Sequence, residues 1–175
     1  MDRTASTTIV ISIIVLALIG MVLGWRARKT RQSHLPRLAA VPDSAGEPLH
    51  QATLFYVATT IADDPLNRVA VSGLGFRARA SVTVTPQGVV LDLAGQDAGF
   101  IPTADIIRVA RATWTIDRVV ERDGLIALTW TLGDTAIDSY LRVVEPESPA
   151  ALIAAIESIL EDSTSNERQS ESETE

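Results

Sequence analysis

A long apolar segment near the N-terminus constrains this chain more than any other feature. Residues Thr7 to Trp25 read TTIVISIIVLALIGMVLGW and carry no charge. As a helix rising 1.5 Å per residue, they reach roughly 28 Å, close to the ~30 Å hydrocarbon core of a bilayer. A helix also satisfies its own backbone hydrogen bonds in lipid. The sequence therefore predicts a transmembrane helix over 7–25.

A cleaved signal peptide is the alternative for such a segment. It requires a basic region before the apolar run, a shorter run and a cleavage site with small residues. Here Asp2 offsets Arg3, and the run ends in Trp-Arg-Ala-Arg-Lys, which is typical of a stop-transfer sequence. The spanning helix is the favoured interpretation.

Basic residues on one side of the segment predict its orientation. Trp25 is placed to meet the headgroups, and the basic flank that follows it is Arg26, Arg28, Lys29 and Arg31. Basic flanks stay cytoplasmic. We therefore expect a single-pass plasma-membrane protein with residues 1–6 outside and the C-terminal domain in the cytoplasm. The flank could also bind anionic lipid headgroups, although a topology signal alone explains it.

Composition argues against catalysis and against metal or cofactor chemistry. The chain has no cysteine, and from residue 51 onward it has no histidine or lysine either. Zinc sites use His and Cys, activated nucleophiles lean on a His or Lys base, and Walker-type phosphate loops need a lysine. Asp117, Asp123 and Asp138 could suggest a carboxylate site, but scattered solvated acids explain them. We predict no enzyme activity and no cofactor.

The charge of the domain argues against nucleic acid as a partner. Residues 52–160 hold 8 Arg against 13 Asp or Glu, a net charge of −5. Residues 161–175 hold six acids and one arginine, which is again −5. A negative domain is a poor ligand for DNA, RNA or bare anionic lipid.

The remaining sequence divides into three parts. Residues 26–50 contain three prolines and few apolar side chains, which predicts a basic juxtamembrane segment and a linker. Residues 51–160 carry the strand and helix patterns of one domain. Residues 161–175 lack large apolar side chains and predict a disordered acidic tail.

Within 51–160 the hydrophobic period is two, which indicates strands. Turn signals separate the alternating runs at 86–88 and at Gly133-Asp134. The segment 104–111 is ambiguous between helix and strand, with strand favoured from Ile106. After Ser148-Pro149 the period changes, and Leu152, Ile153, Ile156, Ile159 and Leu160 form one stripe on a helix of about three turns. About seven antiparallel strands closed by an amphipathic helix is the plan of a pleckstrin-homology-like (PH-like) roll.

Several short segments resemble a known family. These are 56–60 (YVATT), 68–70 (RVA), 73–80 (GLGFRARA), 100–102 (FIP) and Gly124-Leu125. They are similar to actinobacterial membrane proteins that have one N-terminal transmembrane helix and a bacterial PH-like domain. The resemblance implies this fold and topology but no reaction, since the members are uncharacterised and some are labelled transporter or export proteins.

One departure from that family concerns a basic residue. At 137–140 this chain has Ile-Asp-Ser-Tyr, where the family more often has a Thr-Gly-Phe-Arg type ending. Any anion contact made by that arginine is missing here unless Arg142 substitutes for it.

Two arginines are the candidate contacts for a partner or an anion. Arg77 and Arg79 alternate on one predicted strand, so they share a face. With Arg68, or with Arg108 and Arg111, they could form a basic patch that meets lipid headgroups or an acidic segment. Solvated arginines paired with acids are the simpler interpretation. Gly73 and Gly75 are interpreted as turn or bulge residues, and Trp130 as core.

The sequence favours a noncatalytic interaction or scaffold module, held at the cytoplasmic face of the membrane by its helix. It would bind a protein segment, for example as an added strand at an open sheet edge. The alternative is an accessory subunit of a membrane transporter. Lipid sensing and catalysis are the weaker hypotheses.

Overall fold

The computed structural model describes residues 3–31, 35–70, 73–112, 114–115, 118–119, 125–144, 146 and 148–172. The chain divides into two compact units, Met1–His34 and Leu35–Glu175. Each unit is described by itself below.

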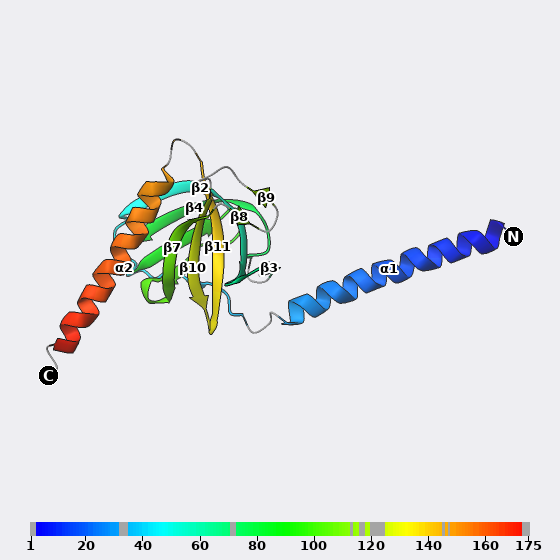
Figure 1. Cartoon of the computed structure of the whole chain (residues 1–175), viewed down its shortest axis with the longest axis horizontal. Coiled ribbons are helices and arrows are strands. Elements are labelled where there is room, and N and C mark those ends of the chain that lie inside the picture. Colours follow the sequence, from blue (N-terminus) through cyan, green and yellow to red (C-terminus); the bar gives the residue numbers. More distant parts are fainter. Residues whose placement is uncertain are drawn as a thin grey trace. The chain divides into compact units, whose positions relative to one another are not determined.

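The first unit is one helix, α1 (Arg3–Arg31), drawn in blue in Figure 1. It continues past the predicted end at Trp25 because Arg, Ala and Lys are good helix formers and no Gly or Pro interrupts them. Its polar Ser12 Oγ donates a hydrogen bond to the carbonyl oxygen of Thr8 at 2.9 Å. That bond leaves the hydroxyl satisfied within the helix, as a lipid environment requires.

The second unit is built on one antiparallel sheet of nine strands. Its path runs β1-β6-β5-β4-β2-β11-β10-β7, and β3 pairs with β2 off this path. The bounds are β1 (Ala39–Ala40), β2 (His50–Ile61), β3 (Asp64–Arg68), β4 (Ala78–Thr85), β5 (Gly88–Leu93), β6 (Gly99–Pro102), β7 (Ile106–Ala112), β10 (Leu125–Leu132) and β11 (Thr135–Val143). A separate pair is formed by β8 (Trp114–Thr115) and β9 (Arg118–Val119), and a 3-10 turn, η1, covers Thr103–Asp105.

The sheet curves around a core that helix α2 (Pro149–Ser172) covers (Figure 1). This confirms the predicted mainly β architecture with a closing helix, and it settles 106–112 as a strand. The β10–β11 hairpin turns at Gly133, whose φ of 63° lies in the left-handed region that glycine tolerates. Gly73, with φ of 80°, has the same role in the loop before β4.

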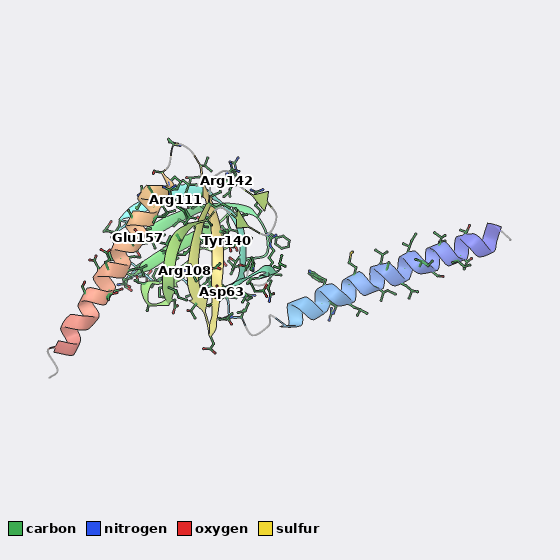
Figure 2. The ribbon with its side chains drawn as sticks, viewed as in Figure 1. Asp63, Arg108, Arg111, Tyr140, Arg142 and Glu157 are labelled. Carbon is green, nitrogen blue, oxygen red and sulfur yellow. The ribbon has the colours of Figure 1, made fainter. Side chains whose placement is uncertain are left out.

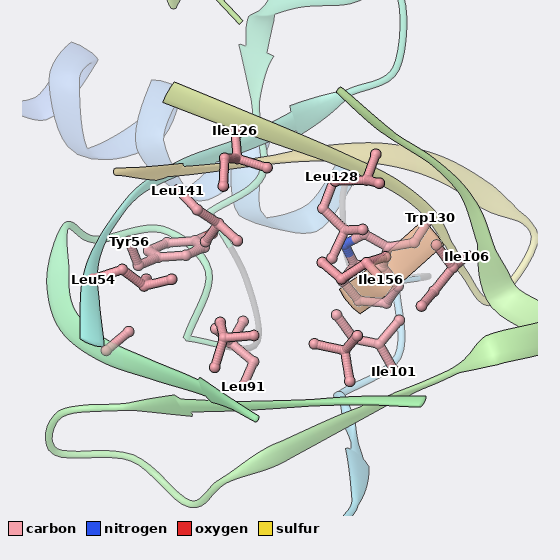
Figure 3. Close-up of a cluster of buried hydrophobic side chains, with 14 of the residues drawn as sticks. Leu54, Tyr56, Leu91, Ile101, Ile106, Ile126, Leu128, Trp130, Leu141 and Ile156 are labelled. Atoms are coloured by element: carbon pink, nitrogen blue, oxygen red, sulfur yellow. The ribbon is translucent and has the colours of Figure 1, made fainter. Parts of the chain in front are cut away.

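The core is a continuous cluster of aliphatic side chains around Tyr56 and Trp130 (Figure 3). Trp130 is 2% exposed, which confirms its predicted core position. Helix α2 adds Leu152, Ile156 and Ile159, all of them buried. Burial of each large aliphatic side chain contributes roughly 1.5–3 kcal/mol, so the stripe on α2 fixes the helix against the sheet.

The domain begins earlier than the sequence indicated. The sequence predicts a basic juxtamembrane segment and linker over 26–50, yet Leu35 is buried in the core cluster and strand β1 pairs with β6. Leu38 packs against Gly99, where a Cβ would collide with the leucine side chain. Within the same segment the Ala45 amide donates a hydrogen bond to the carbonyl oxygen of Pro42 at 3.0 Å, which closes a turn.

Helix α2 also ends later than the sequence indicated. The predicted helix ended near residue 160 and a disordered tail followed, whereas α2 continues to Ser172. No Gly or Pro interrupts 161–172. The hydroxyls of Ser163, Thr164 and Ser165 donate to carbonyl oxygens three or four residues earlier, at 2.8–2.9 Å. These local bonds satisfy polar groups within the helix.

Candidate functional site

A row of three side chains crosses the outer face of the sheet. Strand pairing places Phe55 of β2 opposite Arg142 of β11 on one side and opposite Arg79 of β4 on the other. The guanidinium carbon of Arg79 lies 5.9 Å from the centroid of the Phe55 ring. This distance is within the range of a cation–π contact. The row therefore alternates cation, aromatic ring and cation.

Arg77 completes the group from the segment just before β4. Together with Phe55, Ala78, Arg79 and Arg142 it lines an open depression of about 400 Å³. We call these five residues the arginine depression. All three of its arginines are exposed. The structure therefore brings the predicted pair Arg77 and Arg79 to one surface and adds Arg142 and Phe55 to it.

The arginine depression concentrates positive charge on an acidic domain. Among the described residues, no carboxylate forms an ion pair with Arg77, Arg79 or Arg142. Neighbouring strands lie about 4.8 Å apart, so Arg79 and Arg142 are separated by roughly 10 Å at the backbone. Two like charges at that distance repel by about 0.4 kcal/mol in water. A repulsion of this size is small compared with the stability of a folded domain. An anion bound between the two arginines would be attracted to both of them.

The other arginines considered from the sequence do not line this depression. Arg68 is part-buried on β3 and donates through Nη2 to the carbonyl oxygen of Val57 at 3.2 Å. Arg108 and Arg111 lie on β7, which strand β10 separates from β11 (Figure 2). The wider patches that include Arg68, Arg108 or Arg111 are therefore not formed at this depression.

The inner face beneath this row holds a buried network of hydrogen bonds. The Tyr56 hydroxyl lies 2.5 Å from Thr59 Oγ1 and donates to the carbonyl oxygen of Leu74 at 2.8 Å. Thr59 Oγ1 lies 2.8 Å from Ser139 Oγ, which accepts from Trp130 Nε1 at 3.0 Å. Burial raises the pKa of Tyr56 well above its usual range. The network joins β2, β10, β11 and the loop at Leu74, and its groups are satisfied by one another.

The described residues offer little for acid–base or metal chemistry. Asp138 is buried, and its Oδ1 accepts a hydrogen bond from Thr129 Oγ1 at 2.5 Å. Burial raises the pKa of nearby Tyr140. Within the described part of the chain, no three His, Cys, Asp or Glu side chains gather closely enough to hold a metal ion. Asp117 and Asp123, considered with Asp138 as a carboxylate group, lie outside the described residues.

A comparison with family models identifies the fold. A model described as bacterial PH domain-like matches residues 35–157. The chain belongs to this bacterial PH-like family. The match begins at the same residue as the second compact unit. No curated protein matches the chain. PH-like domains are generally noncatalytic and mediate interactions, so the surface of the PH-like domain is the place to look for function.

The apolar helix that precedes the PH-like domain in the sequence is a second candidate element. Among the described residues, Thr7–Arg26 is long and apolar enough to cross a membrane, with mean hydropathy 2.6 and none of it buried. Trp25 is 61% exposed on the helix, and Arg26 is exposed as well. Arg28, Lys29 and Arg31 continue the backbone of α1, and their side chains are outside the described part.

Sequence reasoning missed Phe55 and gave Arg142 only as a substitute for a family arginine. The alternation of β2 and β11 shows which residues share a face of each strand. It does not show that β11 pairs with β2 rather than with another strand. The available signal was the basic residue near the end of β11, in a domain where arginine is outnumbered by acids.

Proposed function

We propose that this chain is a membrane-anchored, noncatalytic interaction module on the cytoplasmic face of the plasma membrane. Its PH-like domain binds an acidic segment of a partner protein in the arginine depression. The observation that carries the proposal is the group Arg77, Arg79 and Arg142 around Phe55, without an ion pair to any described carboxylate.

The chemistry of the arginine depression favours a carboxylate-bearing ligand. A guanidinium presents a planar fork of donors that matches a carboxylate, and such charge-assisted bonds are about twice as strong as neutral ones. The Phe55 ring adds apolar area between the cations. An acidic peptide with an apolar side chain would satisfy both features.

The open shape of the arginine depression favours a polypeptide over a small molecule. Small-molecule pockets bury 70–90% or more of a ligand's surface. A site formed by exposed side chains on one sheet face leaves its occupant largely in solvent. A segment carried by a larger partner can add contacts elsewhere, whereas a free metabolite cannot.

Strand addition at the sheet edge is a second way to bind a segment. Strand β7 is the last strand on one side of the sheet path, and its Ile107 is 54% exposed. An added strand there would gain main-chain hydrogen bonds. This mode predicts contacts at β7, away from the arginine depression, so mapping the contacts distinguishes the two.

In-cell crosslinking of the full chain tests the proposal. The variant Arg77→Glu/Arg142→Glu should lose about tenfold of its crosslinks to a partner protein, equivalent to 1.4 kcal/mol. The matched control Arg37→Glu/Arg108→Glu has the same net charge and alters exposed arginines outside the depression. Equal losses in both variants would contradict the proposal. Multi-pass membrane proteins among the partners would favour the accessory role in a transporter.

A further inference from the structure

We infer that the acidic segment 161–175 of one copy docks in the arginine depression of a second copy. This rests on the proposed function, because it names the partner of that same depression. Three features of the PH-like domain support it: the charge of the segment, its freedom from the core, and the direction in which α2 leads it.

The charges of the two surfaces are complementary. Segment 161–175 carries a net charge of −5, and its Glu161 and Asp162 are exposed. The depression presents three arginines without an ion pair to a described carboxylate. Each surface has an excess of one sign, and opposite charges steer association and fix its register.

The acidic segment has no side chain suited to the apolar core. The buried stripe of α2 consists of Leu152, Ile156 and Ile159. From residue 161 onward the sequence has no large apolar side chain. In Figure 1 the C-terminal part of α2 extends beyond the sheet that its first turns cover. The segment is therefore available for another surface.

The geometry of the domain directs the segment away from its own depression. Strand β11 ends at Val143, next to Arg142, and α2 begins at Pro149 (Figure 1). Helix α2 has 24 residues, so at 1.5 Å per residue its far end lies roughly 36 Å from its start. Docking within one copy would require the helix to break and turn back. Docking between copies requires no change of fold.

The acidic segment and the arginine depression are different surfaces of the same chain, so two copies can exchange segments reciprocally in a closed dimer, or each copy can pass its segment on head to tail. In the head-to-tail arrangement each copy uses its segment on one neighbour and its depression on another, and such contacts extend into rows unless they close into a ring. Anchoring of all copies in one membrane raises their effective concentration. We therefore expect closed dimers, rings or rows of this protein at the membrane.

Sedimentation of the full chain in detergent micelles tests the inference. The depression variant is Arg77→Glu/Arg142→Glu. The segment variant is Glu161→Lys/Asp162→Lys/Glu167→Lys/Glu171→Lys. The natural chain should self-associate at low ionic strength and separate at high salt, because exposed charges are screened. Each variant alone should associate at least tenfold more weakly, and an equal mixture of the two should recover complexes.

The mixture is the decisive measurement. In it, the acidic segment of the depression variant can bind the unchanged arginine depression of the segment variant. The segment variant alters no core residue, which keeps the test valid if the depression variant folds poorly. The control Arg37→Glu/Arg108→Glu should associate as the natural chain does. Unchanged association in the segment variant, or a mixture of the two folded variants that stays dissociated, would overturn the inference.

The same variants separate this inference from the proposed function. If the segment variant changes nothing while the depression variant still loses its partner in cells, the inference fails and the proposed function stands. If the depression variant keeps all its crosslinks, the proposed function fails too.

Discussion

Strand β2 has two faces that differ sharply, and neighbouring residues show the difference. Tyr56 points inward and is fully buried. Its hydroxyl forms hydrogen bonds with Thr59 Oγ1 and with the carbonyl oxygen of Leu74. Phe55 points outward, between Arg79 and Arg142. On the inner face, Tyr56, Thr59, Ser139 and Trp130 satisfy one another's polar groups, and their burial stabilises the fold. The outer face leaves its charges available, which is the property expected of a binding surface.

The largest expected effect comes from the inner face. Trp130→Ala removes a buried ring and the donor to Ser139, and should lower the free energy of unfolding by about 3–5 kcal/mol. Phe55→Ala on the outer face should lower it by about 1 kcal/mol or less. Urea unfolding of the full chain in detergent, followed by circular dichroism, compares them. Similar losses would mean that the outer face is structural as well.

The next effect concerns the buried hydroxyl of Tyr56. Tyr56→Phe leaves the carbonyl oxygen of Leu74 without this donor, and should cost about 1–3 kcal/mol. The loop around Leu74 should also exchange its amide hydrogens faster. Hydrogen exchange of the loop amides should be faster in Tyr56→Phe and unchanged in the control Phe55→Leu, which alters the outer face of β2. Faster exchange in both would show that the loop is not held by the hydroxyl.

Alkaline pH should weaken the domain through its tyrosines. Burial raises the pKa of both Tyr56 and Tyr140 above 10.0, so the neutral form is favoured when folded. Their stabilising effect is complete below pH 10 and declines as pH rises, because the unfolded chain deprotonates first. Each tyrosine should contribute a slope of up to about 1.4 kcal/mol per pH unit.

The variant Tyr56→Phe/Tyr140→Phe is the matched test, since the chain has two tyrosines. Its unfolding free energy should change little between pH 9 and 11, roughly the window around the reference pKa. The natural chain should lose stability over the same range. Parallel curves would show that other groups control the alkaline response.

The smallest expected effect is on binding. Phe55→Leu keeps an apolar side chain but removes the ring face beside Arg79, a contact worth about 0.5–1 kcal/mol at an exposed site. Partner crosslinks should fall by about two- to fivefold, with stability nearly unchanged. A loss as large as that of Arg77→Glu/Arg142→Glu would make the ring, rather than the charges, the main contact.

The sequence predicted which residues of one strand share a face. It did not predict which strands pair with each other, or in which register. Alternation correctly placed Leu128 and Trp130 on a buried face. It did not predict that Thr59 joins Tyr56 inside, because the β2–β11 register shifts at Tyr140/Leu141 and leaves Val57 as an extra residue. Local spacing alone indicates that Arg77 and Arg79 share a face. The pairing that adds Arg142 links segments far apart in sequence, and no local pattern encodes it.

The ends of the domain show a similar limit. Prolines around Leu35 and Leu38 suggested a linker, and the acids after Leu160 suggested disorder. Prolines indicate a backbone preference and acidic residues indicate solubility. Neither shows which side chains contact each other in the folded domain. Composition does not predict the tertiary contact between Leu38 and Gly99. It also does not predict the local hydrogen bonds that Ser163 and Thr164 donate within α2.

Site-specific photo-crosslinking in cells tests the central claim most directly. Thr53 is exposed on the outer face of β2, two residues from Phe55, and Ala104 is an exposed control position in η1. A crosslinker at Thr53 should capture an acidic polypeptide segment, and Arg77→Glu/Arg142→Glu should reduce the product about tenfold. Capture of the same proteins from Thr53 and Ala104, unaffected by the arginine changes, would contradict the claim that the arginine depression binds a partner.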